Sequence, residues 1–217
     1  MSPLISIILP VSNAACFLSD CLNSLLKQTY KNFEIIAIDD ASGDSSFKIL
    51  KNFKKKDKRL RSFRNVKKYG VSVCLNRALK KAKGEFIAFM GQNDICLPNR
   101  LQKQLLYLNT NPKIAVLGSQ FRGINKKNEL KGKSRFPTDP DLIRQTHFSG
   151  LPLKFETLMI NKTILPKDIL KFPAKFQAFK NSANDFYIDT LLKTLSYADF
   201  ANLNEYLYKG RILSSSS

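Results

Sequence analysis

The stretch from Gly84 to Gln104 constrains the fold most, because a strand, a polar corner and a helix start follow one another directly. Residues 86–90 form a short continuous apolar run, which is typical of a buried strand. The corner 91–94 follows, and a helix is expected from near Pro98, since proline is favoured in a first helical turn. Ligands of α/β proteins bind at the carboxyl ends of such strands. The corner is therefore the first candidate site.

Strand-like and helical segments alternate through the first half of the chain. We expect strands over residues 4–9, 33–38, 60–66, 86–90 and 114–118, and helices over 14–28, 45–56, 71–81 and from about 98. This alternation favours a parallel sheet covered by helices on both faces. Further along, residues 121–150 are predicted as loops, 155–160 as a strand and 185–195 as a helix.

The length of 217 residues suits one domain with a full core. We expect that domain over residues 1–213, divided into halves at 1–118 and 119–213, with a tail at 214–217. No apolar run reaches the roughly 18 residues that span a bilayer. The N-terminus lacks the basic region of a signal peptide. Four cysteines without CxxC or metal-ligand spacing indicate reduced thiols and a cytoplasmic protein.

The charge is strongly basic and unevenly distributed. The formal net charge is +19, and between Lys48 and Lys83 there are fifteen Lys or Arg residues against one acid, Asp57. Such a surface attracts nucleic acid, anionic lipid headgroups or diphosphates, although a solvated lysine-rich surface explains it equally well. No RNP, zinc-finger or basic-zipper pattern is present, so nucleic acid is not the expected partner. The single histidine, His147, is interpreted as structural or exposed.

Four segments in order resemble the inverting family 2 glycosyltransferases with the GT-A fold. They are SIILPVSNAACFLSDCLNSLLKQTYKNFEIIAIDDASGDSS, LNRALKKAKGEFIAFMGQNDICLPNRLQKQ, FETLMINKTIL and SANDFYIDTLLKTLSY. The resemblance implies an α/β, Rossmann-like three-layer GT-A fold with a central, mostly parallel sheet. It also implies that residues 1–118 form the nucleotide-sugar-binding half and residues 119–213 the acceptor-side half. The chain is short for that family, which leaves room for a further C-terminal acceptor or membrane element.

The resemblance also implies a reaction and partners. The expected activity is transfer of a sugar from a nucleotide sugar, UDP-linked by preference, to an acceptor hydroxyl with inversion. The acceptor would be a glycan or a lipid-linked intermediate in cell-surface polysaccharide or glycolipid synthesis. The basic surface would then place the protein at the inner face of an anionic membrane.

Several residues match the donor-binding positions of that family. Asp40 looks like the carboxylate that accepts a hydrogen bond from the base, a role that suits an acceptor-only group. Asp39, beside it, is interpreted as a turn residue. Ser12 stands where the family often has an aromatic residue that stacks on the base. The residues expected to border the donor are Pro10, Val11, Ser12, Asn13, Asp40, Gly70, Arg77, Gln92, Asn93 and Asp94.

The chain departs from the family at the acidic DxD motif, whose last carboxylate holds Mg²⁺ or Mn²⁺ against the diphosphate. Gly91, Gln92 and Asn93 occupy its three positions, and only Asp94, just beyond, is acidic. Three interpretations stay open: a weakened metal site made by Asn93 and Asp94, neutralisation of the diphosphate by Lys or Arg, or a silent relative that binds nucleotide sugars without turnover.

The second acidic site is Asn184-Asp185, where the family usually has Glu-Asp. Asp185 resembles the catalytic base that deprotonates the acceptor hydroxyl as it attacks the anomeric carbon. The alternative for Asp185 is a helix N-terminal residue that is favoured by the helix dipole.

Overall fold

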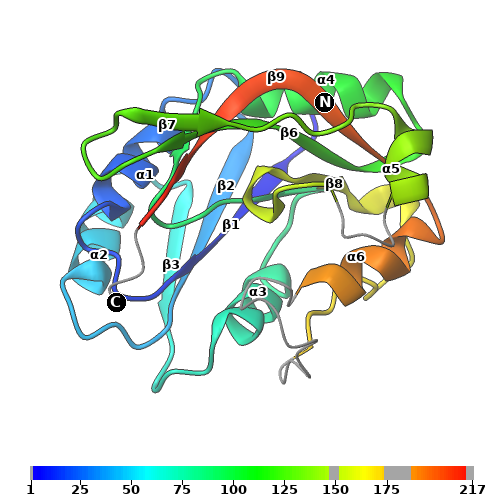
Figure 1. Ribbon diagram of the computed structural model, residues 1–217. Coiled ribbons are helices and arrows are strands. Elements are labelled where there is room, and N and C mark those ends of the chain that lie inside the picture. The colour runs from blue at the N-terminus through cyan, green and yellow to red at the C-terminus, as the bar shows by residue number, and fades with distance from the viewer. Residues whose placement is uncertain (1, 147–151, 174–186, 214–217) are drawn as a thin grey trace.

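The computed structural model describes residues 2–146, 152–173 and 187–213, which are built around one nine-stranded sheet (Figure 1). The strand order is β3-β2-β1-β4-β8-β6-β9-β5, and β7 pairs with β6 outside this path. The strands are β1 (Ile5–Val11), β2 (Phe33–Asp39), β3 (Leu60–Arg64), β4 (Phe86–Phe89), β5 (Ile95–Cys96), β6 (Ile114–Ile124), β7 (Leu130–Lys133), β8 (Met159–Asn161) and β9 (Asp199–Arg211).

The sheet is mostly parallel, as the resemblance implied. Strands β3, β2, β1 and β4 pair in parallel. The short β8 is antiparallel to both β4 and β6, so β6 runs in the direction of β4, and β9 is parallel to β6. Only β5, β7 and β8 run the other way. In β1 and β2 every residue except Pro10 is buried, because helices cover both faces.

The helices are α1 (Leu18–Leu26), α2 (Ser46–Lys56), α3 (Val71–Leu79), α4 (Arg100–Thr110), α5 (Pro140–Thr146) and α6 (Ile188–Leu195), with 3-10 turns η2 (Phe155–Thr157) and η3 (Lys162–Ile164). One core joins apolar residues of α1, α2 and α4 to one face of the sheet. A second core joins α3 and α6 to the other face. Figure 1 shows α3 and α6 at the bottom of the view with the sheet above them. Among the described helices, none has the length and apolar character needed to cross a bilayer.

The second half departs from the sequence prediction. The predicted loops over residues 121–150 are wrong in three places, because β6 continues to Ile124 and both β7 and α5 lie within that range. The strand predicted over 155–160 is a 3-10 turn followed by β8. The sequence prediction also missed β9, which pairs with β6 along its length despite register shifts.

A buried carboxylate ties the amino ends of the parallel strands together. Glu34 on β2 accepts hydrogen bonds from the Ser6 hydroxyl (2.8 Å), the Lys83 backbone N–H (2.8 Å) and the Arg61 guanidinium (2.6 Å). Burial raises the pKa of Glu34, but these hydrogen bonds outweigh it and hold the pKa below the ordinary value of 4.5. One side chain thus connects β1, β2, β3 and the turn before β4.

We expect Glu34→Gln to lower the free energy of unfolding by about 2 kcal/mol, because one acceptor oxygen becomes an N–H group that faces at least one of the three donors, and the charge that pairs with Arg61 is lost. A carboxylate with a lowered folded pKa stabilises the protein above its ordinary pKa, and this stability is lost as the pH falls through the folded pKa. The deficit of the variant should therefore shrink from pH 6 to pH 3. Urea unfolding across this range tests it. The exposed Glu129→Gln is the control, and an equal deficit at every pH would contradict the assignment.

Candidate functional site

A cavity of about 290 Å³ opens at the carboxyl ends of β1, β2 and β4. Its walls come from the end of β1, the residue after β2, the first turn of α3, the end of β4 and η2. Five residues predicted to border a donor line it: Pro10, Val11, Ser12, Asp40 and Gln92. The other five, Asn13, Gly70, Arg77, Asn93 and Asp94, lie outside its lining. The three strand ends therefore meet at the cavity, and half of the expected residues lie in its wall.

Asp40 organises the loop that leads into α3. Its carboxylate accepts hydrogen bonds from the Asn65 amide (2.6 Å) and from the backbone N–H groups of Tyr69 (2.9 Å) and Gly70 (2.8 Å). Burial raises the pKa of Asp40, but these bonds outweigh burial and lower the pKa below its ordinary value. Asp40 is thus ionised at neutral pH. It still has lone pairs for a donor N–H group in the cavity.

Gly70 and Arg77, which were predicted to border the donor, help to hold the loop that leads into α3. Gly70 has a φ of 89°, a left-handed conformation that favours glycine, and its N–H thereby reaches Asp40. The Arg77 guanidinium donates to the Arg64 carbonyl (2.9 Å) and to the side-chain oxygen of Asn65. Arg77 therefore holds Asn65, which in turn holds Asp40.

Asn13 ties the end of β1 to the turn after β2. Its backbone N–H donates to the Ser42 hydroxyl (3.0 Å), and its side-chain oxygen accepts from the Gly43 N–H (2.9 Å). The buried Asp39 accepts from the Ser42 N–H (3.2 Å) and pairs with Arg64 (3.2 Å), as expected of a turn residue.

The corner after β4 is held from both sides. On the β1 side, the Gln92 side chain accepts from the Ser12 N–H (2.6 Å) and donates to the Ser12 carbonyl (3.1 Å). On the β9 side, the Asp94 carboxylate accepts from the Tyr208 hydroxyl (2.7 Å) and from the Arg211 N–H (2.7 Å). Asp94 is buried, and that burial raises the pKa of its carboxyl above the ordinary value.

The corner offers poor ligands to a divalent cation. Gly91 has no side chain, Asn93 is uncharged, and both Asp94 oxygens already accept hydrogen bonds. Hard cations prefer carboxylate oxygens. Across residues 2–146, 152–173 and 187–213, no group of three or more His, Cys, Asp or Glu side chains is placed to hold a metal ion. The metal role predicted for Asn93 and Asp94 thus gains no support from this geometry, and the donor set does not fit Mg²⁺ or Mn²⁺.

Sequence reasoning missed one acid at the cavity, Glu156 on η2. Glu156 lines the cavity and pairs with Lys154 (3.1 Å), and its side chain is 35% exposed. It lies inside the segment FETLMINKTIL, which resembles the family and whose residues 155–160 were predicted as a strand without a site role. An acid at the start of that segment was the available signal. Glu156 reaches the cavity because η2 packs beside β4, and the sequence alone does not reveal that packing.

Three residues considered in the sequence, His147, Asn184 and Asp185, lie outside the described residues. The first described helix after them is α6, which begins at Ile188. The role of Asp185 therefore stays a prediction.

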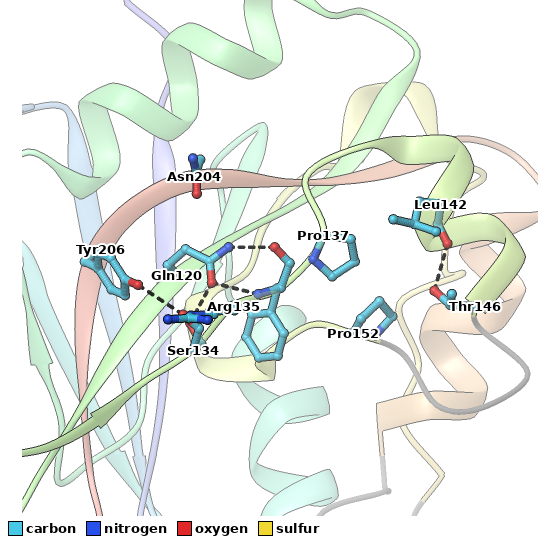
Figure 2. Close-up of a pocket in the computed structure, with 10 residues that line it drawn as sticks. Gln120, Ser134, Arg135, Pro137, Leu142, Thr146, Pro152, Asn204 and Tyr206 are labelled. Carbon is cyan, nitrogen blue, oxygen red and sulfur yellow. Dashed lines mark hydrogen bonds between the residues drawn. The ribbon is translucent and has the colours of Figure 1, made fainter.

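A second cavity of about 510 Å³ is lined by residues of β6, β9, α5 and the segment after β7 (Figure 2). Polar groups in its wall bond to one another: the Gln120 amide bonds to Ser134 and to the backbone of Phe136, and the Tyr206 hydroxyl donates to the Ser134 carbonyl. Arg135 is the charged residue among the described residues that line it. The hydrogen-bonding groups of Gln120, Ser134 and Tyr206 are therefore engaged within the wall of this cavity.

The fold and the cavity agree with a comparison against protein families. Residues 6–188 match the model of glycosyl transferase family 2. The chain belongs to glycosyltransferase family 2. As a member of this family, it is 33% identical over 167 residues to the Escherichia coli enzyme UDP-Glc:alpha-D-GlcNAc-diphosphoundecaprenol beta-1,3-glucosyltransferase WfgD, covering 75% of this chain and 64% of that protein.

Solved structures share the GT-A fold of this family 2 member. Staphylococcus aureus TarS in complex with UDP-GlcNAc superposes with a TM-score of 0.78 at 23% identity, over 98% of this chain and 59% of that one. The mannosyltransferase PcManGT from Pyrobaculum calidifontis, in complex with GDP-Man and Mn²⁺, gives 0.71 at 14% identity, over 100% and 59%. The chain thus spans about three fifths of these proteins, and the likeness concerns the fold.

We expect Asp40→Asn to release the loop before α3, because the amide loses acceptor capacity and sets N–H against N–H. Amide hydrogen exchange at Tyr69 and Gly70 should accelerate by about tenfold or more. Asp44→Asn is the matched control, because Asp44 accepts from the N–H groups of Ala15 and Ser46 instead. Unchanged exchange at Tyr69 and Gly70 in Asp40→Asn would contradict the role given to Asp40.

Proposed function

We propose that this protein transfers a sugar from a nucleotide sugar, UDP-linked by preference, to an acceptor hydroxyl with inversion. The observation that carries the proposal is the cavity at the carboxyl ends of β1, β2 and β4, with ionised Asp40 in its wall. Membership of family 2 supports the reaction class. The relative whose name specifies UDP-glucose and the neighbour solved with UDP-GlcNAc support the choice of nucleotide.

The order of the strands suggests how the donor lies. Asp40 follows β2, the corner follows β4, and η2 packs against β4 on the side away from β2. In our proposal the nucleobase lies at Asp40, whose carboxylate accepts a hydrogen bond from an N–H group of the nucleobase. The diphosphate passes the corner near Gly91 and Gln92. The sugar then reaches Glu156, whose carboxylate can accept hydrogen bonds from sugar hydroxyls.

The chemical step needs one proton transfer. The acceptor hydroxyl attacks the anomeric carbon from the face opposite the diphosphate, and the bond from that carbon to the diphosphate oxygen breaks. Asp185 takes the hydroxyl proton as the new bond forms, and the nucleoside diphosphate leaves with the bonding electron pair. Attack from the opposite face inverts the anomeric configuration. No step in this proposal passes through a metal ion.

A second candidate function is nucleotide-sugar binding without turnover. The loss of both motif acids at Gly91 and Asn93 favours it. Binding of a nucleotide sugar without transfer or hydrolysis, with and without Mn²⁺, would select this candidate over the transferase.

We expect the wild-type protein to bind UDP and to transfer or hydrolyse UDP-glucose or UDP-GlcNAc. Asp185→Asn should lower kcat by about 10²- to 10⁴-fold with little change in UDP affinity, because it removes the catalytic base and leaves the contacts to the nucleotide unchanged. Calorimetry and a UDP-release assay measure the two quantities. Asp189→Asn, an exposed carboxylate in the first turn of α6, is the matched control. Wild-type kcat in Asp185→Asn would refute the assignment of the base.

The loop beside the cavity supports a further part of the proposal, a cytoplasmic protein bound at an anionic membrane. Val66 is 91% exposed and Tyr69 is 43% exposed, and both flank the exposed Lys67 and Lys68. Apolar side chains on either side of two lysines suit the boundary between lipid headgroups and acyl chains. Val71, which follows the loop, lines the donor cavity. A lipid-linked acceptor, as named for the Escherichia coli relative, would then be presented next to the donor.

We expect the double substitution Lys67→Glu and Lys68→Glu to weaken co-sedimentation with phosphatidylglycerol vesicles by about tenfold or more, because each lysine contributes about 1 kcal/mol near such a surface. Lys126→Glu with Lys127→Glu changes the net charge equally on a distant exposed turn and is the control. Equal losses in both double variants would indicate a diffuse charge effect and contradict a specific role for the loop.

A further inference from the structure

The corner has no room for a side chain at residue 91. A Cβ atom placed on Gly91 would lie 2.3 Å from an Asp94 carboxylate oxygen, 3.0 Å from Asp94 Cγ and 3.1 Å from the Tyr208 hydroxyl oxygen. Real Cβ contacts essentially never fall below 3.0 Å. Residue 91 and the Asp94 carboxylate therefore compete for one volume. As long as Asp94 points toward β9, position 91 must be glycine.

Both oxygens of the Asp94 carboxylate accept hydrogen bonds from residues of β9. One oxygen accepts from the Tyr208 hydroxyl (2.7 Å) and the other from the Arg211 N–H (2.7 Å). The Tyr208 oxygen accepts in turn from the Gly91 N–H (2.9 Å), so its hydroxyl hydrogen is directed to Asp94. Tyr208 is completely buried and Asp94 nearly so. These groups form a closed cluster, the Gly91–Asp94–Tyr208 cluster, that joins the corner to the last strand.

Arg100 and Arg211 brace the same cluster. The Arg100 guanidinium lies 5.2 Å from the centre of the Tyr208 ring and donates to the carbonyls of Phe89 (3.0 Å) and Leu158 (3.2 Å). The Arg211 guanidinium donates to the Asn93 carbonyl (2.9 Å) and packs 4.1 Å from the centre of the Phe17 ring. The backbone of the corner is thus held at Phe89, Gly91 and Asn93.

We infer that Asp94 is a positioning residue that fixes the donor corner onto β9, and that the corner works without a protein-held cation. Glycine at position 91 then leaves the space that the cluster occupies. PcManGT was solved with Mn²⁺, whereas the corner of this chain is closed by hydrogen bonds that a cation would have to break. The test by UDP affinity rests on the proposed donor site, whereas the test by melting temperature does not.

The spatial competition is tested by melting temperatures. Gly91→Asp should lower Tm by about 5 °C or more, because the new side chain collides with Asp94. Asp94→Ala should also lower Tm, since it leaves the Tyr208 hydroxyl and the Arg211 N–H without an acceptor. The double variant Gly91→Asp with Asp94→Ala should melt higher than the sum of the two losses predicts. Additive losses would overturn the competition.

The positioning role is tested by UDP affinity in the full chain, with Mn²⁺ and with EDTA. Wild-type affinity should agree within about twofold in the two conditions, and Gly91→Asp should gain no Mn²⁺ dependence. Asp94→Asn and Tyr208→Phe should each weaken UDP binding about fivefold or more at a temperature where both are folded, by the same factor in Mn²⁺ and in EDTA. Asp20→Asn and Tyr197→Phe, both exposed, are the controls.

Two results would overturn the inference. One is wild-type UDP affinity that rises tenfold or more with Mn²⁺ and loses that dependence in Asp94→Asn, as a metal ligand requires. The other is a Tyr208→Phe variant with wild-type UDP affinity and Tm. If the wild type bound no UDP in either condition, the proposed function would fail, while the Tm coupling of positions 91 and 94 would still decide whether the cluster exists.

Discussion

The parallel pairing of β1 with β2 on one side and β4 on the other is the constraint on which the site depends. In this register Ile5 lies opposite both Phe33 and Phe86, so the three strands start together and end at the same edge. Their backbone groups are buried between two apolar layers and must pair with one another. A shift of one residue would turn each buried side chain to the opposite face and separate Asp40 from Gln92.

The first half of the fold could be predicted because its signals are local. The run FEIIAI and the run FIAFM are buried on both faces, so each marks a strand without knowledge of its neighbours. The second half could not be read in the same way. All four residues of β7 are exposed, and they form a strand only because β6 offers hydrogen bonds. In β9, register shifts break the alternation that would mark a strand.

The residues of the candidate site show the same contrast between local signals and contacts that are distant in sequence. Asp40 was predicted from the resemblance to the family, at the end of a strand that the sequence also marks, and it lies in the cavity wall. Asp94 also follows a strand end, but its partners, Tyr208 and Arg211, are more than a hundred residues away in sequence. No local pattern separates an acid that faces a ligand from one that faces a distant strand. Glu156 was missed for a related reason, because packing of η2 beside β4 brings it to the cavity.

The attachment of the corner to β9 also bears on how the molecule could be divided. The boundary expected near residue 118 separates donor-side from acceptor-side residues, but β5 pairs with β9 and β4 pairs with β8 across it. Residues up to 118 would contain every strand end at the cavity, yet the corner would lose the hydrogen bonds that Gly91 and Asp94 make with β9. The strands before and after residue 118 therefore share one sheet, and a fragment that ends there would lack both Glu156 in the cavity wall and the β9 partners of the corner.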